Sequence, residues 1–276
     1  MNLLIDVGNR RLKWAYSTQL VANNKSNRFE GGPDTAIQYQ VESSDLPGLE
    51  KCATKRFAAA VEPELAESMT PDTVYVSSVA CDQVNLRLAQ ICEELWRLSP
   101  VFIRSGNNAC GITNRYDKPK HLGVDRWAAL IGARRRVPSQ HALLVIDVGT
   151  AVTIDYVDSA GVFYGGMILP GIATMIGSIN RSTDKISVDS LPKPGQQICF
   201  QNPRTKEAVS NGVLHAVVSS IDSAIDHFMN LDRNGFDTII TGGDARLIEP
   251  LSRHNMQTVP ELVLMGILTL SEVEKF

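Results

Sequence analysis

The chain has few cysteines, and they lie far apart. Its five cysteines, among 276 residues, include no Cys-x-x-Cys pair, and its five histidines have no His-Glu-x-x-His spacing. An odd number of scattered cysteines does not indicate a disulfide framework, and a zinc site needs Cys or His ligands at short spacings. The sequence therefore predicts neither, and we expect a reducing, cytoplasmic compartment.

Long apolar runs and a strong charge of one sign are also missing. No stretch reaches the ~18 apolar residues of a membrane span, and the N-terminus runs directly into a strand-like segment that carries Asp6, unlike a secretory signal. The formal net charge is only −3. The composition therefore gives no reason to expect nucleic acid or a membrane as a partner.

The two commonest nucleotide-binding signatures are absent. The chain contains neither a GxxxxGK[ST] P-loop nor a GxGxxG dinucleotide fingerprint. Short apolar runs instead alternate with longer helical patterns, which is typical of an α/β fold. A length of 276 residues with 43% hydrophobic residues predicts two domains of ordinary size.

One short segment does occur twice, as LLIDVGN from Leu3 and as LVIDVGT from Leu144. Each copy is typical of a buried strand that ends in an aspartate, a spacer and a glycine, with a second strand after the turn. Glycine lets backbone N–H groups converge on an anion, and Asn9 or Thr150 adds a side-chain donor. A single Asp-x-Gly would indicate only a turn, but two copies in equivalent settings favour a pair of phosphate-binding hairpins.

The repeat also suggests where the domains divide. We expect a first domain at 1–115 with the first hairpin, and a second at 116–276, because the pattern restarts there. A long helix at about 206–231 carries one apolar stripe, which is most simply part of the core and alternatively part of a subunit interface.

Four further segments narrow the identification. They are GVDRWAALIGA (123–133), VIDVGTAVTIDYVD (145–158), GGMILPG (165–171) and TGGDA (241–245). Together with the paired DxGN…K and DxGT arrangement, they resemble the type III pantothenate kinases, the family of the Bvg accessory factors, within the actin-like ATPase and sugar-kinase superfamily. The resemblance runs from residue 3 to about 270 and is weak between 17 and 70.

The resemblance implies a fold and an activity. The fold is two ribonuclease-H-like domains with mixed sheets flanked by helices, which grip ATP between their hairpins. The activity is the ATP-dependent phosphorylation of pantothenate to 4'-phosphopantothenate, the first step of coenzyme A biosynthesis. A homodimer through the long helix is also implied.

The resemblance also assigns the reacting end of the substrate. Asp125 would be the general base that takes the proton from the pantothenate hydroxyl, in a substrate motif with Gly123 and Val124. A helix N-terminus would keep this carboxylate ionised, as a base requires; the alternative is a helix N-cap, and the two roles do not exclude each other. Arg126 would pair with the substrate carboxylate, with a surface ion pair as the alternative.

Two further substrate residues follow from the resemblance alone. Tyr116, in NRYDKP, matches the substrate tyrosine, and the alternative is a half-buried aromatic residue. Thr205, in NPRTKEAV, matches a threonine that reaches pantothenate across the dimer interface. Without the resemblance, Thr205 reads as a helix cap.

In the first hairpin, Val7, Gly8 and Asn9 would contact ATP. Asp6 is repelled by phosphate, so it more plausibly holds a bridging cation, here Mg²⁺. Lys13, on the second strand of the hairpin, would lie near the phosphates.

In the second hairpin, Asp147 is the counterpart of the first aspartate and would help to hold a monovalent cation, K⁺ or NH₄⁺. Thr150 would hydrogen-bond phosphate. Gly242 and Gly243 would let the backbone approach the adenosine, with an ordinary strand-to-helix turn as the alternative.

One residue departs from the family pattern. Arg10 stands where the family usually has Ser or Thr, so a small hydroxyl donor is lost from the first phosphate turn. Arg10 either replaces it as a cationic ligand, points to solvent, or crowds the turn. It is the reason to consider a catalytically weakened, nucleotide-binding regulatory protein as the alternative function; a kinase of a related hydroxy acid is a third.

Overall fold

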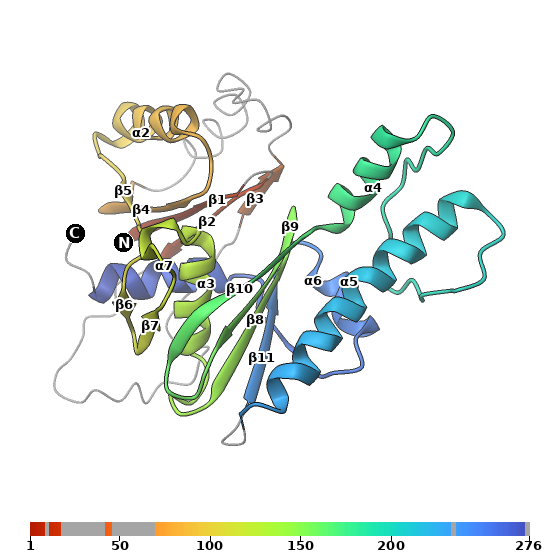
Figure 1. The fold of residues 1–276 in the computed structure, drawn as a ribbon. Coiled ribbons are helices and arrows are strands. Elements are labelled where there is room, and N and C mark those ends of the chain that lie inside the picture. Colours follow the sequence, from red (N-terminus) through yellow and green to blue (C-terminus); the bar gives the residue numbers. More distant parts are fainter. Residues whose placement is uncertain (9–10, 18–41, 46–69, 233–235, 274–276) are drawn as a thin grey trace. The chain divides into compact units, whose positions relative to one another are not determined.

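The computed structural model describes residues 1–8, 11–17, 42–45, 70–232 and 236–273 (Figure 1). These residues form two mixed β-sheets flanked by helices, which confirms the predicted α/β class. Contacts divide the chain into two units, Met1–Cys110 with Lys120–Gly132 and Val263–Phe276, and Gly111–Pro119 with Ala133–Leu262. The units are thus interleaved along the chain, whereas the sequence suggested one boundary at residue 115.

The first sheet contains the first copy of the repeated segment. Its strands are β1 (Asn2–Val7), β2 (Arg11–Ser17), β3 (Glu42–Asp45), β4 (Thr73–Ser78) and β5 (Val101–Phe102), in the order β3-β2-β1-β4-β5. Strand β1 pairs antiparallel with β2 and parallel with β4. The hairpin predicted from the first copy of the repeated segment is therefore confirmed.

The two faces of β1 have different neighbours. Leu3, Ile5 and Val7 belong to one apolar cluster with Leu88 and Ile91 of helix α2 (Asp82–Trp96). Because successive side chains of a strand point to opposite faces, Leu4 and Asp6 lie on the face away from α2. Figure 1 shows α2 along one side of β1 and β4.

Helices α3 (Val124–Arg134) and α7 (Leu262–Val273) make backbone contact in the first unit. A Cβ atom placed on Gly266 of α7 would lie 1.8 Å from the carbonyl oxygen of Ala128 in α3. Trp127 and Leu130 of α3 are fully buried beside this contact. Only glycine at 266 allows the two helix backbones to approach so closely at Ala128.

The second sheet repeats the first. Its strands are β6 (Asn108–Ala109), β7 (Ile112–Asn114), β8 (Ala142–Val148), β9 (Ala151–Val157), β10 (Val162–Pro170), β11 (Phe236–Thr241) and β12 (Gln257–Thr258). Within the order β12-β11-β8-β9-β10-β7-β6, the five strands β10-β9-β8-β11-β12 match β3-β2-β1-β4-β5 in order and in direction. The repeated sequence thus marks a repeated sheet.

Helices α4 (Ile172–Ser182) and α5 (Thr205–Met229) belong to the second unit, as does the short α6 (Ala245–Ile248). The predicted long helix is confirmed, and its stripe at Val213, Val217, Ile221 and Ile225 is buried in one cluster with β8 and β9. Residues 183–204, all of them described, form no helix or strand. Within the described ranges, no helix combines the length and apolarity that crossing a membrane requires.

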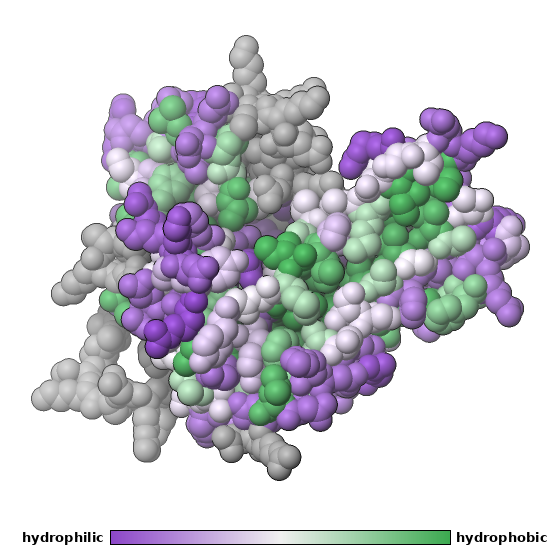
Figure 2. All heavy atoms as spheres, in the orientation of Figure 1, coloured by the Kyte–Doolittle hydropathy of each residue, from purple (hydrophilic) through white to green (hydrophobic). Residues whose placement is uncertain are grey.

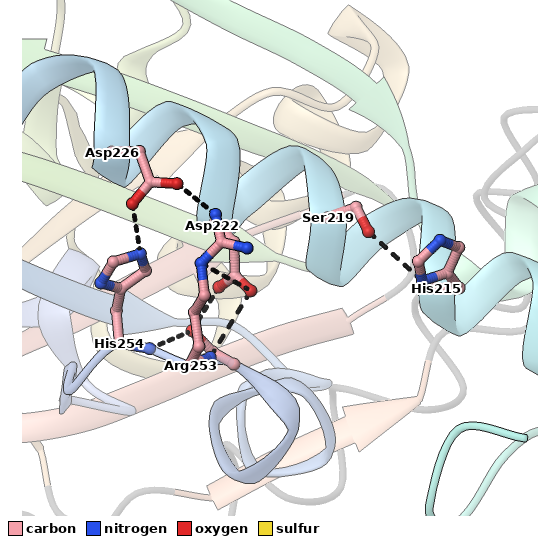
Figure 3. Close-up of polar contacts among 7 residues, drawn as sticks. His215, Ser219, Asp222, Asp226, Arg253 and His254 are labelled. Atoms are coloured by element: carbon pink, nitrogen blue, oxygen red, sulfur yellow. Dashed lines mark hydrogen bonds and ion pairs between the residues drawn. The ribbon is translucent and has the colours of Figure 1, made fainter.

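A polar cluster fastens α5 to the segment that follows α6 (Figure 3). Asp222 accepts a hydrogen bond from the Ser252 hydroxyl at 2.6 Å, while Asp226 pairs with Arg253 and with Nε2 of His254, the latter at 2.9 Å. Asp222 is buried, so it needs such partners. The cluster holds the chain between the 242–244 turn and β12 against α5.

The contact of α3 with α7 yields a stability prediction. Gly266→Ala should lower the free energy of unfolding by about 1–3 kcal/mol, because the new methyl group meets backbone and not a flexible side chain. Urea unfolding followed by circular dichroism measures this. Gly106→Ala is the control, since a Cβ there meets nothing within 4 Å; equal midpoints for the two variants would contradict the contact.

Candidate active site

Asp6 lies in a row of polar side chains across the first sheet. Its register partners are Lys13 on β2 and Ser77 on β4, and all three point away from α2. Asp6 is buried, with 9% of its surface exposed, whereas Lys13 is half-buried and Ser77 is fully buried. The row brings a carboxylate, an ammonium group and a hydroxyl to the end of β1.

The first turn is closed by backbone hydrogen bonds. The Gly8 N–H donates to the Arg11 carbonyl at 2.9 Å, and the Val7 carbonyl accepts from the Val79 N–H at 3.1 Å. The predicted ATP contacts Val7 and Gly8 therefore lie at the end of β1. Asn9, the predicted donor, and Arg10, the divergent residue, lie outside the described residues.

The second turn is shorter than the first. Val148 pairs with Val152, whereas Val7 pairs with Leu12, so the first loop contains one more residue. The Gly149 N–H donates to the Ala151 carbonyl at 2.9 Å. The two copies of the motif thus share a strand and an aspartate but differ in the turn that follows.

Helix α4 holds the second turn in place. The Thr150 carbonyl accepts hydrogen bonds from the Gly171 N–H at 2.9 Å and from the Thr174 hydroxyl at 2.7 Å. A Cβ on Gly171 would lie 2.0 Å from the Gly149 carbonyl oxygen, so glycine is required there. The sequence prediction missed Gly171 and Thr174, although the GGMILPG segment contains the first of them.

Asp147 lies against the glycine turn that follows β11. Gly242 has a positive φ of +96°, and a Cβ there would lie 2.4 Å from Asp147 Oδ1 and 2.4 Å from the Val148 carbonyl oxygen. Gly242 is therefore required by this close approach, and Gly243 beside it is exposed. The turn leads into the short α6, so the strand-to-helix turn considered as the alternative is present. This turn also lies against Asp147, the predicted ligand of the monovalent cation.

Asp147 also lies in a row across its sheet. Its register partners are Thr153 on β9 and Thr241 on β11. This row matches Lys13, Asp6 and Ser77 strand for strand, but neutral hydroxyls flank the aspartate on both sides.

Asp125 lies in the first turn of α3. The Gly123 carbonyl accepts the Trp127 N–H at 3.0 Å, so Gly123 occupies the cap position and the N-cap alternative for Asp125 is wrong. Asp125 Oδ1 accepts the Arg126 N–H at 2.7 Å. The positive end of the helix favours an ionised carboxylate here. Val124 is the first residue of the helix.

Arg126 is a buried residue, with 7% of its surface exposed. The surface ion pair considered as its alternative is therefore wrong. A buried guanidinium group requires anionic or hydrogen-bonding partners, which is compatible with a role in holding a carboxylate.

Tyr116 follows β7 in the second unit. Its ring is parallel to that of Phe163, with centroids 6.3 Å apart, and its N–H donates to Asn114 Oδ1 at 3.0 Å. Gly165, at φ +122°, lies beside the ring edge. The ring is half-buried, as its structural alternative expected, and its remaining surface is accessible.

Thr205 is the exposed first residue of α5. Arg204 takes the cap position and pairs with Glu207 at 2.8 Å. The cap alternative for Thr205 is therefore wrong, because Thr205 is the first residue inside the helix.

An apolar groove runs between α4 and α5. It has a volume of about 600 Å³, and its lining includes Met175, Ile179, Val209 and Gly212. Figure 2 shows apolar surface gathered over these two helices.

The predicted site residues fall into both contact units. The first unit holds the substrate motif and the first hairpin, namely Asp6, Val7, Gly8, Lys13, Gly123, Val124, Asp125 and Arg126; the second unit holds Tyr116, Asp147, Thr150, Thr205, Gly242 and Gly243. Within the first unit, Asp6 is the register partner of Lys13. Within the second unit, Asp147 lies against the turn at Gly242.

The fold is similar to that of a solved structure. A Baf family transcriptional activator of Campylobacter jejuni superposes with a TM-score of 0.50 at 18% identity, and the match covers 98% of each chain. This similarity concerns the fold alone.

Curated relatives are similar over nearly their whole length. The type III pantothenate kinase of Nitrosococcus oceani is 30% identical, with 99% of this chain and 94% of the relative covered. That of Nitrosomonas eutropha is 31% identical, with 99% and 95% covered. The family model described as type III pantothenate kinase matches residues 2–227. With most of its length matched by that model, the chain belongs to the type III pantothenate kinase family.

Proposed function

We propose that this protein transfers the γ-phosphoryl group of ATP to pantothenate, which yields 4'-phosphopantothenate and ADP in the first step of coenzyme A biosynthesis. The observation that carries the proposal is the family match over residues 2–227. Full-length relatives that are named type III pantothenate kinase support it.

Asp125 is the general base of this proposal. Its carboxylate accepts the proton of the pantothenate primary hydroxyl as that oxygen attacks the γ-phosphorus and the bond to the ADP oxygen breaks. Placement in the first turn of α3 favours the ionised form that the step requires.

Substrate binding is assigned to the residues around this base and to two others. Arg126 would pair with the pantothenate carboxylate, since a guanidinium fork matches two carboxylate oxygens. Gly123 and Val124 would line the substrate beside it. Tyr116 would supply an aromatic face, and Thr205 would act from a second copy of the chain.

Both hairpins would bind the phosphates of ATP. Val7, Gly8 and Asn9 would supply donors in the first hairpin, with Lys13 as a charged contact. Thr150 would supply a donor in the second, because its backbone is fixed by Gly171 and Thr174. Gly242 and Gly243 would lie nearest the adenosine.

The residues present fit the two proposed cations. Mg²⁺ commonly takes one or two protein carboxylates and completes its shell with phosphate and water, and Asp6 supplies one carboxylate. Among the described residues, no group of three His, Cys, Asp or Glu side chains could hold a metal alone. K⁺ or NH₄⁺ at Asp147 would have the nearby Val148 carbonyl as a second oxygen. Such cations offset the negative charge of the phosphates during transfer.

A homodimer through α5 is part of the proposal. Ala208, Gly212 and Ala216 are exposed at four-residue spacing along the apolar groove, which allows another helix to approach closely. We expect light scattering to give the mass of two chains, and a monomer at working concentrations would contradict this.

The cytoplasmic location and the lack of a nucleic-acid or membrane partner stay predictions. Nothing in the described residues favours the alternative of a regulatory protein.

The role of Asp125 has a direct test. Asp125→Asn should lower kcat with pantothenate by about 100- to 10,000-fold, because general-base catalysis is lost. ADP release in the presence of ATP, Mg²⁺ and pantothenate measures it. Asp82→Asn is the matched control, since Asp82 is the first-turn acid of α2. Near-normal turnover in Asp125→Asn would remove this residue from the mechanism.

The cation at Asp147 has a separate test. Turnover should require K⁺ or NH₄⁺ and fall when Na⁺ replaces them. Asp147→Asn should lower turnover in K⁺ at least about tenfold and abolish the difference between K⁺ and Na⁺. Turnover that ignores the monovalent cation in the wild type would refute the assignment.

A further inference from the structure

Ser77 has a buried hydroxyl that no partner satisfies among the described residues. Its side chain is fully buried, and its Oγ atom makes no hydrogen bond. Buried polar groups in native proteins are nearly always paired, so such an exception calls for an explanation.

The position of Ser77 places this hydroxyl beside Asp6. The two residues are register partners on the parallel strands β4 and β1, which lie about 4.8 Å apart in a sheet. Their side chains point to the same face, since Val76 and Ile5 both point to α2 on the other. No other strand lies between the hydroxyl and the carboxylate.

Two hydroxyls near this position, one next to Ser77 in the chain and one at the matching place in the second sheet, are satisfied. Ser78, the next residue, donates to Asn85 Oδ1 at 2.5 Å at the start of α2. Thr241, which takes the place of Ser77 in the second sheet, donates to the Pro260 carbonyl at 3.5 Å. Ser77 is therefore not unpaired merely because of its place in the sheet.

We propose that Ser77 is a positioning residue for Asp6: its hydroxyl donates to the Asp6 carboxylate when ATP and Mg²⁺ are bound. Carboxylates that hold a metal are themselves usually hydrogen-bonded, which fixes their orientation. Hydrogen bonds of active sites are often long without ligand and tighten in the complex. The inference rests on one part of the proposed function, namely that ATP and Mg²⁺ bind near Asp6.

The test measures ATP binding by titration calorimetry on the full chain, with Mg²⁺ and with EDTA, and without pantothenate. Ser77→Ala should weaken ATP binding about 10- to 100-fold in Mg²⁺ and leave it unchanged in EDTA. It should also raise the Mg²⁺ concentration needed for half-maximal turnover. The melting temperature without ligand should stay equal or rise, because an unsatisfied buried hydroxyl is removed.

Ser17→Ala is the matched control. Ser17 is also a fully buried serine with an unsatisfied hydroxyl in the same sheet, but its register partner is Asn2 at the far end of β1. Ser77→Thr keeps the hydroxyl and should retain Mg²⁺-dependent binding even if the added methyl group lowers the melting temperature.

Two outcomes overturn the inference. One is Mg²⁺-dependent ATP binding in Ser77→Ala that equals the wild type, and the other is an equal loss in Ser77→Ala and Ser17→Ala. Failure of the proposed function looks different, since the wild type would then bind ATP with Mg²⁺ but release no ADP on addition of pantothenate.

Discussion

The candidate site depends on a carboxylate at the end of a central strand, one face of which packs against an apolar cluster. Strands β1 and β8 each have hydrogen-bonded neighbours on both sides, and one face of each packs in an apolar cluster. Strict alternation then puts Asp6 and Asp147 on the opposite face. Water is largely excluded from Asp6, so its charge must be balanced by polar or charged groups beside it.

The two sheets supply that balance differently. In the first, an ammonium group and a hydroxyl flank the aspartate, whereas in the second the flanking groups are the hydroxyls of Thr153 and Thr241. The second row therefore has one formal negative charge, which is compatible with the proposed monovalent cation. The first row is neutral in formal charge, which is compatible with the proposed phosphate beside Lys13 and metal at Asp6. The two sheets thus share the arrangement of their strands and differ in the residues that flank the aspartate.

Sequence reasoning succeeded where a local pattern decides the structure. A repeated apolar segment that ends in a glycine turn predicted both hairpins, and an apolar stripe predicted α5. It failed at the two caps, where Gly123 and Arg204 precede the residues assigned as caps, because the choice depends on where each helix meets its neighbours. It also missed Gly171 and Ser77. Their environment comes from strands and loops distant in sequence, which no local pattern reports.

Close backbone approach explains why two positions beside the second hairpin require glycine. At Gly171 and Gly242 a single added carbon would meet a carbonyl oxygen of the second hairpin. Gly171 thus lets the start of α4 pack against the turn after β8, and Gly242 lets the turn after β11 pack against the end of β8. Hydrogen bonds from Gly171 and Thr174 then hold the Thr150 carbonyl. A turn held from two sides keeps its donors in place, and in the proposed function this would reduce the entropy lost when phosphate binds and favour phosphoryl transfer.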